Sequence, residues 1–224
     1  MNYLAHGWRF AAEPCFLAGT AAPDWLSVIN RKVRLRSRRA AAHVADADPV
    51  VAAVARGIVQ HHADDAWFHA TSAFHELSLT FAVRLRGALP GDEGFRPSFL
   101  GHILVELLLD AALGEEDPRR LDAYYAALAA LDAGAIQRAI VRLASGPLEQ
   151  GKPAAEPPGA VSHLIARFLE ERFLYDYLDD ARLLVRLNHV MRRVGLPALP
   201  PQVGELLPEM RSVVRRRRDE LLTP

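Results

Sequence analysis

Apolar residues recur at helical spacing along almost the whole chain, and this periodicity constrains the fold more than any other feature of the sequence. Apolar positions three and four residues apart share one face of an α-helix, whereas a half-buried strand alternates apolar and polar residues, and no convincing alternating run occurs. Half of the 224 residues are apolar, so the chain can bury a core of its own. We therefore expect an all-α protein, a single-domain helical bundle over residues 1–224.

Helix start and stop signals divide the chain. Asp48 followed by Pro49 reads as an N-cap and first helical position, and it opens a long helix that is expected to run to about Phe81. Proline and glycine are dense in residues 146–159, which predicts a loop there. Further helices are expected over residues 97–114, 118–131, 135–143, 161–176, 179–193 and 203–221.

The sequence has the marks of a soluble intracellular protein. No stretch longer than about ten residues lacks a charged side chain, whereas a membrane span needs ~18–20 apolar residues. The N-terminal segment has no basic stretch leading into an apolar one, so no secretory signal is expected. Cys15 is the only cysteine, which excludes an intramolecular disulfide. A cytoplasmic location without a membrane span is the expectation.

Positive charge is balanced overall but clustered locally. The 27 basic residues equal the 27 acidic ones, so the chain lacks the global field of a general nucleic-acid binder, and a nucleic-acid partner is not expected. Six of the nine residues from Arg31 to Arg39 are basic, and Arg215 to Arg218 form a second run. Each cluster fits either a solvated face or a site for an anionic partner.

Histidine and acidic residues share helix faces in two places. His61, Asp65 and His69 follow one another at intervals of four residues, which places them on one helix face. His102 and Glu106 repeat the interval on the next long helix. Helical bundles build interior metal sites from such pairs. A buried hydrogen-bonded cluster or a solvated face remains the alternative.

The carboxylates of these helices suggest specific roles. Glu106 is surrounded by apolar residues, and burying a lone carboxylate there would be costly unless it were paired or coordinated. Asp65 lies between two histidines, so it is the first candidate for a catalytic or metal-bridging role, with Glu106 the second. Asp64 or Glu76 is expected to accept a hydrogen bond from the second ring nitrogen of a ligand histidine.

The N-terminal region offers two further candidate ligands. His6 lies in an apolar segment, and Asp24 follows a small-residue turn, Gly19 to Ala22, and Pro23. Asp24 in that setting also fits a plain helix N-cap.

Taken together, these segments resemble the acyl carrier protein phosphodiesterase family, a divergent branch of the helical HD-like metal phosphohydrolases. The resemblance covers most of the chain, in the family's order and spacing, at low identity. It is carried by Met1-Asn2-Tyr3-Leu4-Ala5-His6, Gly19 and Asp24, Gly57-Ile58-Val59-Gln60-His61 with Asp65, the helix of His102 and Glu106, Tyr177, Asp179 and Leu187-Asn188-His189-Val190-Met191.

The resemblance implies an HD-like fold and a divalent metal, usually manganese, that activates water to cleave a phosphodiester. The implied substrate is the phosphopantetheinyl acyl carrier protein. The implied metal-site residues are His6, Asp24, His61, Asp65, His69, His102 and Glu106, with Asp65 and Glu106 as the catalytic candidates.

The chain departs from the family pattern in two respects. His69 and His102 stand where the family is expected to carry aspartates, which favours zinc or iron over manganese or magnesium. His62 and Ala63 stand where arginines are expected, which weakens the match to a phosphopantetheinyl substrate. The opening histidine, the aspartate and the His-x-x-x-acid helix are also similar to the zinc-dependent phospholipase C and nuclease group. Two alternatives belong to other functional classes. One is a non-catalytic helical metal-binding protein, and the other is a protein that binds a protein or nucleic acid through the arginine clusters.

Overall fold

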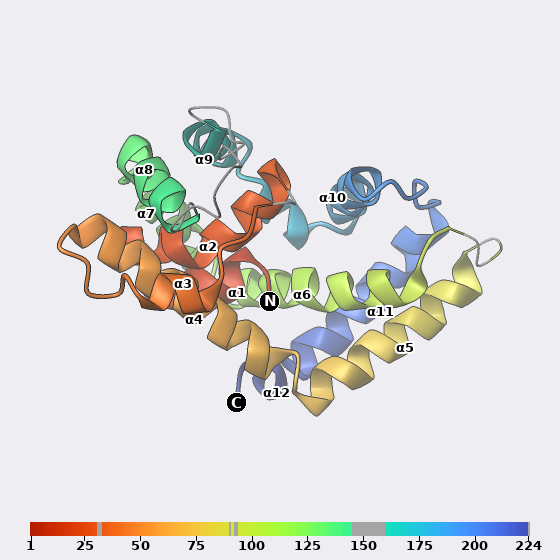
Figure 1. Ribbon diagram of the computed structural model, residues 1–224. Helices are drawn as coiled ribbons and strands as arrows, with labels where there is room; N and C mark the ends of the chain where they lie inside the picture. The colour runs from red at the N-terminus through yellow and green to blue at the C-terminus, as the bar shows by residue number, and fades with distance from the viewer. Residues whose placement is uncertain (31–32, 90, 92–93, 145–159, 224) are drawn as a thin grey trace. The chain divides into compact units, whose positions relative to one another are not determined.

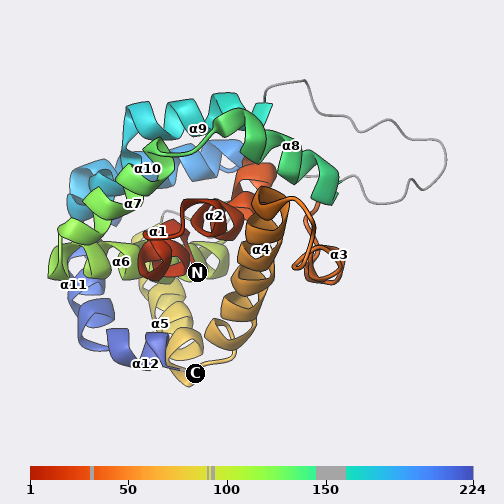
Figure 2. The same cartoon turned by 90° about the vertical axis from the view of Figure 1, so that its left-hand side faces the viewer.

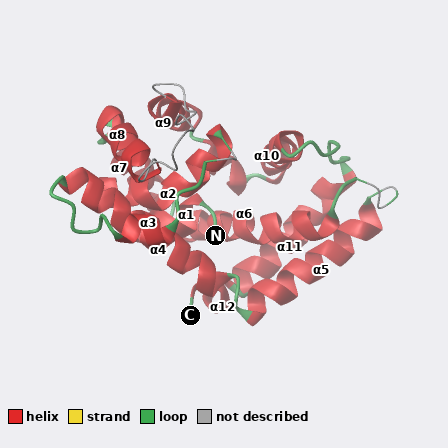
Figure 3. Cartoon of the chain, viewed as in Figure 1, coloured by secondary structure: helices red, strands yellow, loops and turns green. Residues whose placement is uncertain are grey.

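The computed structural model describes every residue except 31–32, 90, 92–93, 145–159 and 224, and the expected 146–159 loop falls in that gap. Within the described residues the protein is all-α, with helices joined by loops and no strand (Figures 1 and 3), so the expected fold class is confirmed. In chain order the helices are α1 (Tyr3–Gly7), η1 (Trp8–Phe10), α2 (Pro14–Ile29), α3 (Ser37–Ala41), α4 (Pro49–Phe68), α5 (Ser72–Ala88), α6 (Pro97–Glu116), α7 (Arg119–Ala129), α8 (Ala133–Ala144), α9 (Ala160–Glu171), η2 (Phe173–Leu178), α10 (Asp180–Arg193), α11 (Gln202–Arg216) and α12 (Arg218–Leu222).

The chain forms two compact units, each assembled from separated segments of sequence. The first unit consists of Met1–Ala5, Asp65–Leu121 and Phe173–Pro224. The second unit consists of His6–Asp64 and Asp122–Arg172. Helices α1, α4 and α7 each begin in one unit and end in the other. Whether the whole chain behaves as one domain stays a prediction.

The first unit is organised around α6. This helix packs against α5, α11 and η2, and α10 packs against η2 and α11. Gly101 allows the backbones of α6 and α5 to approach closely, because a Cβ there would lie 2.4 Å from the Ser78 carbonyl oxygen. By length and composition α6 is the one described helix that resembles a membrane span, but 72% of that window is buried within the protein. Burial to this extent is that of a core helix.

The second unit is organised around α2. This helix packs against α8 and α9, and α8 in turn contacts α3 (Figure 2). Helices α2 and α4 meet at two glycines, where a Cβ on Gly19 would lie 2.9 Å from the Gly57 Cα. Two glycines at one crossing let the backbones of the two helices touch.

Four sequence expectations about helix boundaries are wrong. The helix expected over residues 161–176 ends at Glu171, because Arg172 has a left-handed backbone with φ of 44°, and the 3-10 helix η2 follows. The helix expected from Pro49 to about Phe81 is two helices, because Thr71 caps a new helix through a hydrogen bond from the Phe74 amide to its hydroxyl. The small-residue stretch ending in Pro23 is the middle of α2 rather than a turn. The C-terminal helix breaks at Arg217 into α11 and α12.

Candidate metal centre

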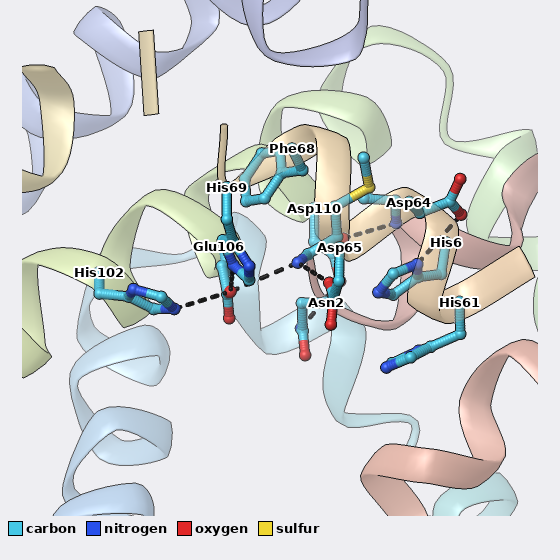
Figure 4. A network of polar contacts seen from close by, with 12 residues as sticks. Asn2, His6, His61, Asp64, Asp65, Phe68, His69, His102, Glu106 and Asp110 are labelled. Atoms are coloured by element: carbon cyan, nitrogen blue, oxygen red, sulfur yellow. Dashed lines mark hydrogen bonds and ion pairs between the residues drawn. The ribbon is translucent and has the colours of Figure 1, made fainter. Parts of the chain in front are cut away.

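Three of the expected ligands converge in the first unit. His69, His102 and Glu106 each offer a ligand atom, and these atoms lie within 4.8 Å of one another. Glu106 Oε1 is 3.0 Å from His69 Nε2 and 3.2 Å from His102 Nε2 (Figure 4). Because both ring nitrogens face one carboxylate oxygen, each carries a proton in the metal-free protein and must lose it to bind a cation.

Local helix geometry places these side chains. His102 and Glu106 are one turn apart on α6. His69 follows the last residue of α4, and its amide still donates to the Asp65 carbonyl, 3.1 Å away. The buried Phe74 ring at the start of α5 lies 4.8 Å from both imidazole rings, so it packs beneath the pair and limits their rotation.

Glu106 is held as an anion by three positive or donor groups. Burial alone would raise the pKa of this carboxyl. The Met1 α-ammonium, 3.4 Å from Glu106 Oε1, and the hydrogen bonds from His102 and His69 outweigh burial and lower the pKa from 4.5 to about 2. The expectation that a buried Glu106 would have partners is confirmed.

The same α-ammonium links Asp65 to the cluster. Met1 N lies 2.7 Å from Asp65 Oδ1, a shorter contact than the one to Glu106. Asp65 and Glu106 therefore share one cation, which places a second carboxylate beside the two imidazoles. The sequence pattern gave no sign that the Met1 α-amino group would contact these two carboxylates.

Asp110 fixes the segment that carries this amine. Its two oxygens accept hydrogen bonds from the Leu4 amide at 2.9 Å, the Ala5 amide at 2.7 Å and the Asn2 side chain at 2.9 Å (Figure 4). These bonds satisfy amides at the start of α1, which have no acceptor within the helix. Asp110, one turn beyond Glu106, is thus an anchor for α1.

The group of His69, His102 and Glu106 is exposed to solvent on the side of its two imidazoles. The side chain of His69 is 34% exposed and that of His102 is 41% exposed, whereas Glu106 is only 13% exposed. A cation held by these three residues would keep a face towards solvent. An open position of this kind is what a catalytic site needs for water or substrate.

A second histidine pair lies in the second unit. The rings of His6 and His61 stack with centroids 4.2 Å apart, and both side chains are buried. Nδ1 of His61 is 2.8 Å from the Thr20 carbonyl oxygen. Since a carbonyl only accepts, that nitrogen carries the proton and the lone pair of His61 is on Nε2.

His6 is oriented in the same way by a carboxylate. Its Nδ1 lies 3.2 Å from Asp64 Oδ2, while the other oxygen of Asp64 accepts from Gln60 Nε2 at 2.7 Å (Figure 4). A carboxylate behind a histidine is the arrangement that orients metal-ligating imidazoles. Asp64 therefore takes the role considered for it, whereas Glu76 pairs with Arg217, 2.7 Å away.

The remaining candidates lie elsewhere. Asp24 sits inside α2, where its carbonyl accepts from Ser27 Oγ at 2.8 Å, so the alternative of an N-cap is wrong. Among the described residues, no group of three potential ligand side chains includes Asp24. His62 stands where the family resemblance predicts arginine, and its Nε2 lies 2.7 Å from the Leu35 carbonyl oxygen.

No protein-family model, curated protein or solved structure matches this chain. The resemblance to acyl carrier protein phosphodiesterases stays a prediction from the sequence. The site must be judged from its own chemistry.

Proposed function

We propose that this chain is a metal-dependent phosphohydrolase. A divalent metal ion, zinc, iron or manganese, is bound by His69, His102 and Glu106, and water is the nucleophile. The observation that carries the proposal is the convergence of two imidazoles and one carboxylate on a common point in the first unit. His6, His61 and Asp24 remain predicted ligands of the second unit.

The spacing of the donor atoms supports a small cation. Metal–ligand bonds of ~2.0–2.1 Å in a tetrahedral shell place neighbouring ligand atoms ~3.3 Å apart. The two contacts to Glu106 Oε1, at 3.0 and 3.2 Å, need only small movements to reach that spacing. Two imidazoles with one carboxylate favour zinc or iron over magnesium, which prefers oxygen ligands.

The exposure of the two imidazoles supports turnover rather than a structural metal. A structural zinc has four protein ligands, whereas this group supplies three and leaves the imidazole side open. A metal ion held by His69, His102 and Glu106 would supply hydroxide near neutral pH, because a divalent metal lowers the pKa of coordinated water towards 7. Its charge also offsets the charge on phosphoryl oxygens.

Asp65 is the proposed proton acceptor. Asp65 and Glu106 both contact the Met1 α-ammonium, and Asp65 is the more exposed of the two carboxylates. In the proposed reaction, Asp65 takes a proton from water as its oxygen adds to phosphorus, one phosphorus–oxygen ester bond breaks, and Asp65 returns that proton to the leaving oxygen, which departs as an alcohol. The choice of a phosphodiester, and of a phosphopantetheinyl carrier protein as one substrate, rests on the sequence resemblance.

Metal content is the first test. Inductively coupled plasma mass spectrometry of the purified protein, after incubation with zinc, iron or manganese, is expected to find bound metal that His69→Ala and Glu106→Ala lose. His189→Ala, which removes an exposed histidine of α10, is the matched control and should keep it. Wild-type protein without metal, or variants that retain all of it, would overturn the proposal.

Hydrolysis is the second test, made on the metal-loaded chain. Bis(p-nitrophenyl) phosphate reports diesterase activity and p-nitrophenyl phosphate reports monoesterase activity. Asp65→Asn is expected to retain metal and lose most turnover, by about 10²–10⁴-fold, because only the proton acceptor is removed. If the protein binds metal but hydrolyses neither ester nor a phosphopantetheinyl carrier protein, it is a metal-binding protein and the proposed hydrolase activity is wrong.

A further inference from the structure

The arginines from Arg34 to Arg38 form a cluster of charge that the fold leaves uncompensated. Arg34, Arg36 and Arg38 are exposed, and within the described part of the chain none of them has an ion pair. The C-terminal arginine run differs, since Arg217 pairs with Glu76 and Glu220. The two clusters look alike in sequence, but in the C-terminal run Arg217 and Arg218 are ion-paired and Arg216 donates to Ser212 within the chain.

The exposed Arg34 and Arg36 lie on either side of the buried Leu35 in the segment before α3. Arg36 has an extended backbone, in which successive side chains point to opposite sides, so the side chains next to Leu35 project away from the core. Arg38 follows on α3.

The segment is fixed from beneath by two contacts within the second unit. His62 Nε2 donates to the Leu35 carbonyl, and Arg39 donates to the Ala144 carbonyl at the end of α8. A cation at the C-terminal end of a helix is also favoured by the helix dipole. Arg39 thus holds the segment in place, and His62 ties it to the turn of α4 that carries His61.

We propose that the cluster of Arg34, Arg36 and Arg38 binds the phosphodiester backbone of a nucleic-acid strand. Guanidinium forks match phosphate oxygens two at a time, and three exposed guanidinium groups within five residues suit a polymer that presents several phosphates. The inference is independent of the proposed hydrolase activity. It reverses the expectation, drawn from net charge alone, that nucleic acid is not a partner.

The surroundings of the cluster favour nucleic acid over a protein or a membrane. Protein interfaces depend on buried aromatic or aliphatic anchors, and the one apolar side chain between the arginines, Leu35, is directed into the core. An anionic membrane attracts basic side chains by charge, but apolar side chains that would strengthen such binding are lacking between Arg34 and Arg38, because Leu35 is directed into the core. Residues 33–39 contain no aromatic ring for base stacking, so binding is expected to be independent of base sequence.

The test is fluorescence anisotropy of a labelled DNA duplex and a labelled RNA strand with the full-length chain. EDTA is present throughout, so metal-dependent hydrolysis plays no part and failure of the proposed function would leave this result untouched. Three phosphate contacts predict that the logarithm of the duplex affinity falls with the logarithm of salt concentration at a slope of about −2.7 between ~50 and ~200 mM salt. Arg34→Gln, Arg36→Gln and Arg38→Gln combined should weaken binding at least ~10-fold and flatten this slope.

A charge-matched triple variant provides the control. Arg84→Gln, Arg119→Gln and Arg167→Gln remove three exposed arginines that have carboxylate partners, and binding should stay within about twofold of wild type. Circular dichroism checks that both variants fold. The proposal is overturned if the wild type does not bind at the lowest salt, if both triple variants weaken binding equally, or if polyglutamate or phosphatidylserine vesicles bind more tightly than the duplex.

Discussion

The two histidine pairs use the same side chains in opposite settings. In the first unit, His69 and His102 are about a third or more exposed, and both rings face the carboxylate of Glu106. In the second unit, His6 and His61 are 1% and 4% exposed, and each has its Nδ1 fixed by an acceptor behind the ring. The first pair is accessible to solvent and to ligands, whereas the second is set in one tautomer by its surroundings.

This difference shows that spacing in the sequence identifies candidate ligands but not their state. Both exposed rings donate hydrogen bonds to Glu106, and the donating nitrogens must lose their protons before a cation binds, so cation binding there should depend on pH. The buried pair depends on close helix packing, since the acceptor of His61 is a backbone carbonyl of α2. Substitutions that change packing should therefore affect His6 and His61 most. Substitutions that change charge should affect His69 and His102 most.

The packing that supports the buried pair should be the easiest feature to break. A Cβ on Gly57, one turn before His61, would lie 2.2 Å from the Phe16 carbonyl oxygen and 2.8 Å from the Thr20 amide. Backbone atoms cannot rotate away, so Gly57→Ala should destabilise the protein by about 3 kcal/mol in urea denaturation. Nitrogen chemical shifts should show His61 losing its fixed tautomer.

Gly87 on α5 supplies the matched control for that substitution. No atom lies within 4 Å of a Cβ built there. Gly87→Ala should therefore stabilise the protein by roughly 0.5–1 kcal/mol through helix propensity alone. Equal destabilisation by both substitutions would show that the helix crossing does not hold His61.

The anchoring of α1 by Asp110 should make the next largest contribution to the free energy of unfolding. Asp110→Ala leaves the buried amides of Leu4 and Ala5 without their acceptor, which should cost about 2 kcal/mol of unfolding free energy. Loss of the anchor should also free the Met1 amine, so the pKa of Glu106 should rise from about 2 towards its usual value. A carboxyl-resolved NMR titration measures the shift. If Glu106 still titrates at about 2 in the variant, Asp110 does not position the amine.

Local signals allowed much of the fold to be predicted. Asp48 caps α4 through hydrogen bonds from the Val50 and Val51 amides, as its residue type and the following proline predict. The stretch from Gly19 to Pro23 is predicted as a turn, because glycine and proline disfavour helix interiors, but it lies within α2. There Gly19 serves a crossing with another helix, which depends on residues almost forty positions away.

The candidate site was predictable to the extent that it is local. The four-residue interval of His102 and Glu106 needs only a helix, but their meeting with His69 depends on how α4 ends and α5 begins. The Met1 amine beside Asp65 has no signature in residue type or spacing. Tertiary structure alone brings a backbone terminus to a carboxylate more than sixty residues away.

The stabilisation that ionised Glu106 provides beside His69 and His102 can be measured from the pH dependence of unfolding. Its pKa in the folded, metal-free protein lies below the 4.5 of an ordinary glutamate, so its ionised form contributes stability that is complete above pH 4.5 and is lost as the pH falls towards 2. Glu106→Gln should cost about 1.5 kcal/mol at pH 7, and its difference from wild type should shrink over that window. A difference that is constant with pH would mean that Glu106 is not stabilised as an anion.

The smallest expected effect concerns the cap that separates α4 from α5 and so determines where His69 projects. The Thr71 hydroxyl accepts from the Phe74 amide at 3.2 Å, and Phe74 packs on both exposed imidazoles. Thr71→Ala should cost about 1 kcal/mol, while Thr71→Ser, which keeps the acceptor, should cost only a few tenths. Because the cap lies in the first unit, Thr71→Ala should weaken cation binding by His69 and His102 and leave the His61 tautomer unchanged. If metal affinity is the same in both variants, the packing of Phe74 holds the two rings without help from the cap.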